Sequence, residues 1–131
     1  MLEKRHVVVC IDDEPAILSS LQRLLRNEPY EFLTTQNPDE AMNLILDKKA
    51  SLVIADQRMP VMTGLDLLEM VKLCSPSTVR VMLTGQSDLT EVVKVKKIDA
   101  IQRLLRKPWD DEGLKKTLKE LLLEQERSAS L

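Results

Sequence analysis

The sequence has one histidine, two cysteines and no long apolar run. The single histidine, His6, excludes a histidine-rich metal centre and argues against histidine-based acid–base catalysis. Cys10 and Cys74 lie in apolar stretches without C-x-x-C spacing, so we expect two buried thiols rather than a disulfide or a metal site. No apolar run approaches the roughly 18 residues of a membrane span, and the N-terminus lacks the features of a signal peptide. These absences predict a cytoplasmic protein that does not bind a membrane.

The bulk composition predicts one globular domain. The chain has 131 residues, of which 44% are hydrophobic and 31% charged, enough to bury a core without disulfides. Its net charge of −2 argues against direct binding of nucleic acid. The charge is nevertheless uneven, because residues 94–107 carry +5 and the remainder −7. The basic segment is either a solvated helix face or a docking surface for an acidic partner.

Apolar runs and helical periodicities alternate along the chain. We expect strands over residues 7–11, 30–35, 52–55, 79–83 and 101–105. We expect helices over 15–26, from 38, over 64–74, over 87–97 and from about 109. This alternation predicts an α/β fold with a doubly wound, five-stranded parallel sheet, and right-handed crossovers favour the flavodoxin-like (βα)5 order 2-1-3-4-5. The helix over 87–97 is rich in β-branched residues and should be the least stable.

The spacing of apolar residues predicts which side of each helix is buried. Asn37, Pro38 and Glu40 are typical of an N-cap, a first-turn proline and a capping-box acid. The expected inward positions are Ile17, Leu21, Leu24, Leu25, Ala41, Leu44, Ile45, Leu68, Val71, Leu114, Leu118, Leu121 and Leu122.

Four of the five predicted strands end on polar residues, which are Asp12 with Asp13, then Asp56, Thr84 and Lys107. Helix capping could explain Thr84 or one of the acids, but it does not explain a lysine in the same place. In the order 2-1-3-4-5 the first and third strands are neighbours at the topological switch point. We therefore expect the three acids to meet in one crevice.

Three crowded carboxylates either raise one another's pKa or bind a cation. Mg²⁺ fits an open crevice, because it takes one or two carboxylates and keeps water and phosphate oxygens as further ligands. Such a site suits phosphoryl transfer to a carboxylate. Asp56 is the expected nucleophile because it stands alone, whereas Asp12 and Asp13 are typical of a metal-binding pair. Thr84 and Lys107 are expected to contact the phosphoryl group.

These residues resemble the receiver domain of two-component response regulators. The resemblance covers residues 1–127, with 128–131 expected to be a frayed tail or the start of a linker. Its motifs are Ile11-Asp12-Asp13-Glu14, Asp56-x-x-Met59-Pro60-x-x-x-Gly64, Thr84-Gly85 and Lys107-Pro108. The sequence 107–111 is similar to a subset of receivers attached to HD-type cyclic-dinucleotide phosphodiesterases or to transcriptional activators.

The resemblance implies a regulatory domain rather than an enzyme, with a phosphohistidine as the phosphoryl donor to Asp56. It implies a magnesium site formed by Asp13, Asp56 and the backbone carbonyl of Arg58, with Asp12 acting through water. It also implies that Thr84 and Lys107 bind phosphoryl oxygens and that the Lys107-Pro108 bond is cis.

The same resemblance implies partners for the chain. The donor would be a sensor histidine kinase or a phosphotransfer protein. Our leading hypothesis is that phosphorylation switches the surface of the fourth helix, fifth strand and fifth helix, because the helix over 87–97 is weak and basic. The output would be a separate partner or a C-terminal domain, and phosphorylation could drive formation of a homodimer. Gln57, Arg58 and Gln86 are expected to border the site and to tune hydrolysis.

Two positions depart from the family pattern. Leu104 stands where receivers usually carry Phe or Tyr, so the aromatic half of the switch is either absent or replaced by another group, while Leu104 itself could simply belong to the core. Asp99 stands where related chains often have Gly, a place that Asp tolerates if φ is positive.

Two other functions remain open on the sequence alone. The chain could be a degenerate receiver that acts as a protein docking module, for which Leu104 is the only support. It could also be a Mg²⁺-dependent phosphohydrolase of the haloacid dehalogenase type. Such an enzyme would carry its nucleophile at the first strand as D-x-D, whereas Asp12 and Asp13 are adjacent.

Overall fold

The computed structural model describes residues 2–85, 88 and 98–130. The strands are β1 (His6–Ile11), β2 (Tyr30–Thr35), β3 (Leu52–Ala55), β4 (Val79–Thr84) and β5 (Arg103–Arg106). The helices are α1 (Pro15–Leu25), α2 (Pro38–Asp47), α3 (Gly64–Cys74) and α5 (Asp111–Ser130), with a 3-10 turn η1 (Ile98–Ala100). The helix expected over 87–97 lies outside the described residues, except for Asp88.

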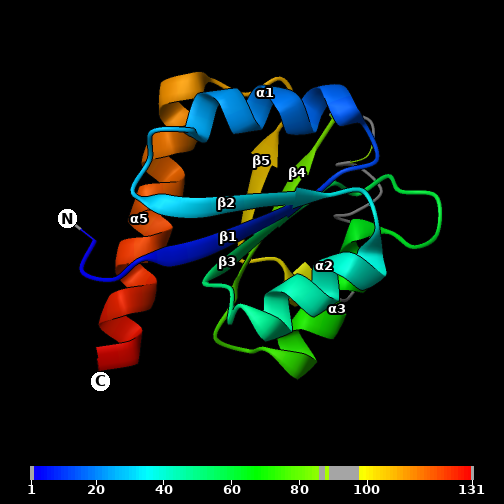
Figure 1. The fold of residues 1–131 in the computed structure, drawn as a ribbon. Coiled ribbons are helices and arrows are strands. Elements are labelled where there is room, and N and C mark those ends of the chain that lie inside the picture. Colours follow the sequence, from blue (N-terminus) through cyan, green and yellow to red (C-terminus); the bar gives the residue numbers. More distant parts are fainter. Residues whose placement is uncertain (1, 86–87, 89–97, 131) are drawn as a thin grey trace.

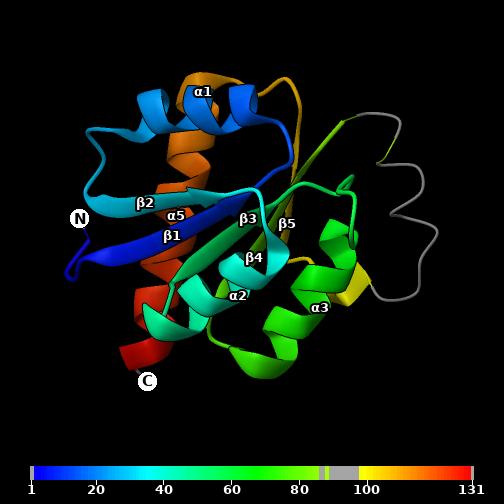
Figure 2. The same ribbon diagram turned by 45° about the vertical axis from the view of Figure 1, so that its right-hand side comes forward.

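The five strands form one parallel sheet in the order β2-β1-β3-β4-β5, as the sequence predicted. Helices α1 and α5 cover one face of the sheet, and α2 and α3 cover the other (Figures 1 and 2). The doubly wound α/β prediction is confirmed. Because all strands run the same way, their carboxyl ends lie at one edge of the sheet.

Side chains that alternate along the strands feed two separate cores. Val8 and Cys10 point into the core under α1 and α5, whereas Val9 and Ile11 point into the core under α2 and α3. All four predicted leucines of α5 are buried. In α1 the buried residues are Leu18, Leu21 and Leu25, while Ile17 and Leu24 are only partly buried, as is Leu44 in α2.

The start of α2 follows the predicted cap. The side chain of Asn37 accepts hydrogen bonds from the backbone N–H groups of Asp39 and Glu40, and Pro38 occupies the first turn. The backbone N–H of Asn37 donates to Thr35 Oγ1 at 3.1 Å, rather than to the carboxylate of Glu40. The N-cap is therefore confirmed, whereas the reciprocal half of the box is replaced by a contact to the end of β2.

Three element boundaries differ from the prediction. Strand β5 begins at Arg103 rather than residue 101, because the 3-10 turn extends to Ala100 and the first paired residue is Arg103, opposite Val81. Helix α5 begins at Asp111 rather than about residue 109, since Asp110 accepts from the N–H groups of Gly113 and Leu114. The helix continues to Ser130, within the segment 128–131 that was expected to be a frayed tail or the start of a linker.

The two cysteines lie in different environments. Cys10 is buried as expected, and burial raises the pKa of its thiol, which stays protonated. Cys74 is exposed, so the prediction of a second buried thiol was wrong. Cys74 is the last residue of α3, and the last buried residue of that helix is Val71. No helix in the described part of the chain combines the length and the apolar character needed to cross a membrane.

His6 occupies a buried polar network that the sequence did not reveal. Its side chain is fully buried at the start of β1, where Nδ1 lies 2.6 Å from Ser51 Oγ and Nε2 lies 2.7 Å from Glu126 Oε2. Glu126 Oε2 also accepts from the backbone N–H groups of Glu3 and Lys4 at 3.0 and 3.2 Å. The imidazole therefore joins the first strand to the last helix, and both ends of the chain lie on this side of the molecule (Figure 1).

Replacing His6 tests the contribution of this network. A His6→Leu variant leaves the buried hydroxyl of Ser51 without its imidazole partner, and an unsatisfied buried polar group costs about 1–3 kcal/mol. We expect a loss of about 2 kcal/mol in the free energy of unfolding, measured by urea denaturation. Gln22→Leu is a control, because its hydrogen bond to Thr34 is exposed. Equal losses in the two variants would contradict the prediction.

Candidate functional site

The backbone of the sheet brings the predicted site residues to one edge. The N–H of Asp56 donates to the carbonyl oxygen of Ile11 at 3.1 Å, which extends the pairing of β3 with β1 by one residue. The N–H of Lys107 donates to the carbonyl oxygen of Thr84 at 2.9 Å and extends the pairing of β5 with β4. Asp56 and Lys107 are therefore each fixed by main-chain bonds at the carboxyl end of a strand.

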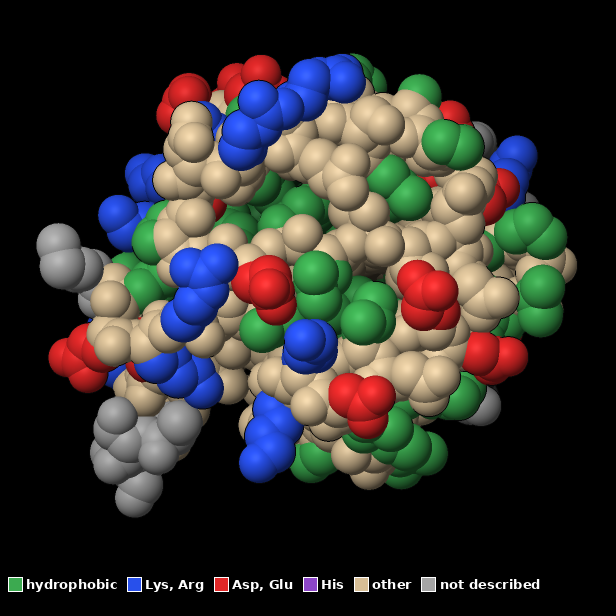
Figure 3. Space-filling model, in the orientation of Figure 1, with side chains coloured by type: hydrophobic (Ala, Val, Ile, Leu, Met, Phe, Trp, Pro, Cys, Tyr) green, Lys and Arg blue, Asp and Glu red, His purple; other side chains and the backbone are tan. Residues whose placement is uncertain are grey.

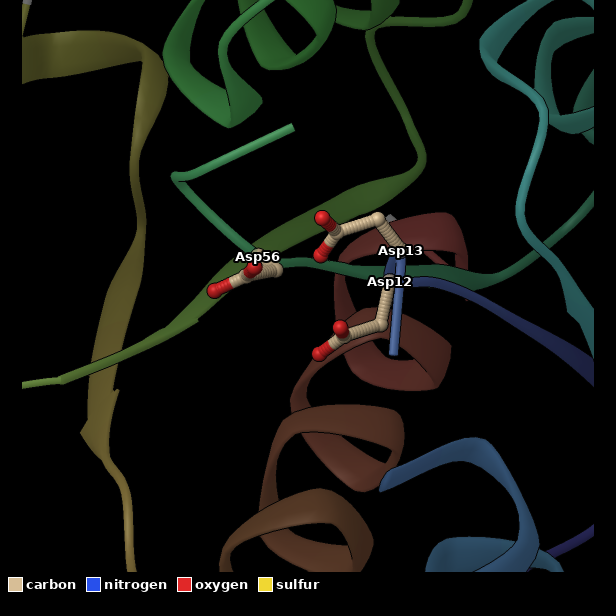
Figure 4. Close-up of side chains that lie close together, drawn as sticks. All are labelled: Asp12, Asp13 and Asp56. Carbon is tan, nitrogen blue, oxygen red and sulfur yellow. The ribbon is translucent and has the colours of Figure 1, made fainter. Parts of the chain in front are cut away.

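The three acids converge as the sequence predicted. Asp12 and Asp13 follow β1 and Asp56 follows β3, and their carboxylates face a common space (Figure 4). One oxygen from each carboxylate lies within 4.8 Å of the others. Asp12 and Asp56 are almost fully buried, whereas Asp13 is partly exposed. The acids are thus close enough to interact strongly with one another and with a shared cation.

Lys107 supplies the positive charge at this edge. Its Nζ lies 2.8 Å from Asp12 Oδ2 and 3.1 Å from Asp56 Oδ1, and 3.8 Å from the more exposed Glu14 Oε1. The other oxygen of Asp12 accepts from the backbone N–H of Glu14 at 2.9 Å. Asp12 is thereby held from two sides, and the ammonium group bridges the carboxylates of β1 and β3.

The electrostatics of the pocket favour a protonated lysine and an acid of reduced acidity. Burial raises the pKa of Asp56, the charges of Asp12 and Asp13 raise it further, and Lys107 opposes them, so the net value is about 6. Burial alone would lower the pKa of Lys107, but the hydrogen bond and charge of Asp12 and the charge of Asp56 outweigh it and raise that pKa. The negative charge of the three carboxylates is thus only partly neutralised by Lys107.

The donor set fits Mg²⁺. All the candidate side-chain ligands are carboxylate oxygens, and the pocket of about 340 Å³ beside them is open to solvent. Arg58 lines this pocket together with Asp13 and Asp56, the acids that the resemblance implies as co-ligands of its backbone carbonyl. The remaining lining residues are Glu14, Gly85, Asp88 and Lys107.

Thr84 ends β4 with a buried hydroxyl. The residue is fully buried, and Oγ1 has no hydrogen-bond partner among the described residues. A buried hydroxyl without a partner carries a free-energy cost, which an incoming acceptor oxygen would relieve. This observation supports the predicted role of Thr84 as a donor to a phosphoryl oxygen.

Gly64 is required by close packing against Asp56. A Cβ at this position would lie 2.3 Å from the carbonyl oxygen of Asp56 and 2.8 Å from its carbonyl carbon. The N–H of Gly64 donates to the carbonyl oxygen of Gln57 at 3.0 Å. The glycine of the motif therefore lets the start of α3 lie directly against the backbone of Asp56.

The two positions that depart from the family pattern have different surroundings. Leu104 is partly buried and packs against the core under α2 and α3, opposite Met82 in the sheet, as the core interpretation predicted. Asp99 lies in η1 without a positive φ, and its carboxylate is 2.7 Å from Lys72 Nζ. The Lys107-Pro108 bond is cis, as the resemblance implied, and Met59-Pro60 is trans.

Sequence reasoning missed Asp88 as a neighbour of the site. Asp88 is buried, and its Oδ1 accepts from the guanidinium of Arg58 at 2.6 Å. Its only sequence signal is its position four residues after Thr84, in a segment expected to be a surface helix.

The fold and the acidic pocket define a receiver-like signalling domain, and the comparisons identify the family. The response regulator receiver domain family matches residues 8–119, so the chain belongs to this family. It is 32% identical over 120 residues to the hydrogenase transcriptional regulatory protein HoxA of Cupriavidus necator. That match covers 92% of this chain and 25% of HoxA. The chain spans about a quarter of the length of the curated relatives it matches.

Solved structures agree with this assignment. The signal receiver domain of an HD domain-containing protein from Pseudomonas fluorescens Pf-5 has a TM-score of 0.90 and 32% identity, over 99% of this chain and 96% of that one. The response regulator TrrA of Thermotoga maritima, in complex with Mg²⁺ and BeF, has a TM-score of 0.78 and 26% identity, over 88% of this chain and 98% of that one. These relatives include both contexts that the sequence 107–111 predicted, an HD-domain protein and a transcriptional regulator.

The raised pKa of Asp56 predicts a pH-dependent cost to stability in excess chelator. The folded-state pKa of about 6 exceeds the ordinary 3.8, so the folded protein holds an extra proton between these values and its stability falls as pH rises through them. We expect Asp56→Asn to raise the free energy of unfolding by about 1–2 kcal/mol at pH 8, a value discounted because the pocket is open to water.

This gain should disappear near pH 4, and urea denaturation at both pH values measures it. Asp47→Asn, at an exposed site in α2, should leave stability nearly unchanged at both. A destabilised Asp56→Asn protein at pH 8 would contradict the charge argument.

Adding a methyl group at Gly64 should disturb Asp56 directly. The atoms that a Cβ would meet are backbone atoms of Asp56, which cannot rotate away, and overpacking of this kind costs about 1–3 kcal/mol. We expect Gly64→Ala to lower the free energy of unfolding by this amount and to weaken Mg²⁺ binding. Gly85→Ala is the matched control for stability, because a Cβ there meets no atom of the described residues within 4 Å. Equal stabilities of the two variants would refute the close-packing argument.

Proposed function

We propose that Asp56 accepts a phosphoryl group from a phosphohistidine of a sensor histidine kinase or a phosphotransfer protein. The observation that carries this proposal is the convergence on one sheet edge of the Asp56 carboxylate and the Lys107 ammonium, 3.1 Å apart, beside two further acids and a buried unpartnered hydroxyl. Membership of the receiver family and similarity to a receiver in complex with Mg²⁺ and BeF support it.

The proposed reaction is a single displacement at phosphorus. A carboxylate oxygen of Asp56 forms the new P–O bond while the P–N bond to the donor imidazole breaks, and the nitrogen keeps the bonding electrons and takes up a proton from solvent. The ammonium group of Lys107 contacts Asp56 and can bind the phosphoryl oxygens, whose negative charge it would stabilise. The Thr84 hydroxyl would donate to one of those oxygens.

The metal ligands in this proposal are Asp13, Asp56 and the backbone carbonyl of Arg58, with Asp12 acting through water. Bound Mg²⁺ would neutralise the acids and the phosphoryl oxygens. Asp12 differs from Asp13 in being bonded to both Lys107 and the Glu14 N–H, which leaves it less freedom to serve as a direct ligand. The structure thus supports different roles for the two adjacent acids.

The proposed consequence of phosphorylation is a switch of the surface formed by the fourth helix, β5 and α5. Arg103 and Arg106 are exposed on β5, whereas Lys94, Lys96 and Lys97 lie outside the described residues, so the basic docking surface stays a prediction. On the face in Figure 3 acidic and basic side chains are interspersed. The output would be a separate partner, a homodimer or a C-terminal domain such as those of transcriptional regulators.

The chain is a regulatory receiver domain, and we propose that it acts in the cytoplasm without turnover of free substrates. The docking-module alternative would require a protein that fails to bind Mg²⁺ and beryllofluoride, and the complete set of site residues argues against it. The phosphohydrolase alternative would require multiple-turnover hydrolysis of small phosphate esters. Asp56 follows β3, whereas Asp12 and Asp13 are adjacent residues after β1, and this departure from a D-x-D motif at the first strand argues against that alternative.

Phosphorylation by phosphoramidate, a small donor with a P–N bond, tests the proposal without knowledge of the kinase. With Mg²⁺ present, we expect intact-protein mass spectrometry to show one added phosphoryl group on the wild-type protein and none on Asp56→Asn, which lacks a nucleophilic carboxylate. Excess chelator should abolish the labelling of the wild-type protein, because the acids would then repel the donor.

Asp47→Asn is the matched control, since it removes an exposed acid remote from the pocket and should be labelled like the wild-type protein. Labelling of Asp56→Asn at the wild-type rate would overturn the assignment of the acceptor. Undiminished labelling in chelator would overturn the metal site.

A further inference from the structure

Arg58 and Asp88 form an ion pair at the mouth of the pocket. Arg58 Nη2 lies 2.6 Å from Asp88 Oδ1, and both residues line the pocket that contains Asp13, Asp56 and Lys107. The two partners differ in environment, because the side chain of Arg58 is 73% exposed and that of Asp88 is 12% exposed. The pair joins the loop after β3 to the segment that follows β4.

The charge at the pocket makes this pair sensitive to phosphorylation. Among the described residues, the acids at the pocket are Asp12, Asp13, Glu14, Asp56 and Asp88, and the cations are Lys107 and Arg58. A phosphoryl group on Asp56 would replace a single negative charge with a charge of about −1.5 to −2 and three strong acceptor oxygens. Guanidinium groups bind such oxygens through a planar fork of donors.

Arg58 can respond to that change because of its position and exposure. It lies two residues after Asp56 in the same loop, and its mostly exposed side chain can rotate at little packing cost. The side chain of Asp88 is buried and therefore has less freedom to move with the guanidinium. The guanidinium rather than the carboxylate would therefore move.

We propose that Asp88 and the phosphoryl group compete for the guanidinium of Arg58, so that the Arg58–Asp88 ion pair restrains the unphosphorylated site and opens on phosphorylation. This inference rests on the proposed function of Asp56. Arg58 is then a phosphoryl-binding residue through its side chain, in addition to the metal-binding role of its carbonyl. Asp88 is a positioning residue that lowers the affinity of the site for the phosphoryl group.

The competition links the chemistry to the chain beyond β4. When Arg58 leaves, the carboxylate of Asp88 loses its cation in a buried environment, which is unfavourable. The position of Asp88 in the unphosphorylated protein is therefore stabilised by a partner that phosphorylation removes. Asp88 lies four residues after Thr84. The loss of the ion pair and the hydrogen bond from the Thr84 hydroxyl to a phosphoryl oxygen would therefore act on neighbouring parts of the chain.

A double-mutant cycle tests the competition, with beryllofluoride in excess Mg²⁺ as the phosphoryl mimic and calorimetric titration as the measurement. Arg58→Ala removes the guanidinium but keeps the backbone carbonyl, and we expect about tenfold weaker binding. Asp88→Asn releases the guanidinium, and we expect binding to tighten about threefold or more. In the Arg58→Ala background, Asp88→Asn should have little effect, because there is no guanidinium to release.

Glu14→Gln is the charge-matched control, because it removes another acid that lines the pocket without a contact to Arg58 among those described. Its effect on beryllofluoride affinity should be the same in the wild-type protein and in the Arg58→Ala background. Arg58→Lys should restore part of the affinity, since it returns the charge without the planar fork.

The outcomes separate this inference from the proposed function. Coupling between Asp88→Asn and Arg58→Ala, with additivity for Glu14→Gln, supports the competition. If the wild-type protein binds beryllofluoride but Asp88→Asn has the same effect in both backgrounds, the competition is refuted and the phosphoacceptor site stands. Failure of the wild-type protein to bind beryllofluoride would overturn both.

Discussion

The contact of the Lys107 ammonium with the carboxylates of Asp12 and Asp56 is the interaction on which the site depends. A parallel sheet delivers the ends of its strands to one edge, and here that edge collects acids whose mutual repulsion burial would intensify. The lysine at the end of β5 offsets part of this repulsion from a strand two places away from β3 in the sheet. The residual negative charge is what makes the pocket suitable for a divalent cation and, with it, for a phosphoryl group.

The packing behind this edge is rigid where the chemistry needs fixed positions. Asp56 is held by its own N–H bond to β1 and by the close approach of Gly64, while Asp12 is held by Lys107 and the N–H of Glu14. Thr84 is different, because its buried hydroxyl has no partner in the described structure. The acids are therefore held in fixed positions, while the Thr84 hydroxyl still lacks an acceptor. This combination suits a phosphoryl group that binds reversibly.

Much of this arrangement could be predicted from the sequence, because each strand is a short apolar run that ends on a polar residue. The strand order and the convergence of Asp12, Asp56 and Lys107 follow from parallel topology and the switch-point rule. Other features lack a local pattern. The bonding of His6 to Glu126 joins residues 120 positions apart, and the partnership of Arg58 with Asp88 joins residues 30 positions apart that follow different strands. The start of β5 was displaced because a 3-10 turn occupies residues 98–100. The register of β5 with β4 begins at Arg103, just after Gln102, whose N–H donates to the carbonyl oxygen of Arg80.

The network around His6 connects the start of β1 to the C-terminal part of α5. Strand β1 carries His6 at one end and leads directly into Asp12 at the other, and six strand residues span roughly 20 Å. Through the imidazole, the C-terminal part of α5 is fastened to this strand. The strand whose far end leads into Asp12, the acid bonded to Lys107, is therefore anchored at its start by the last helix of the chain.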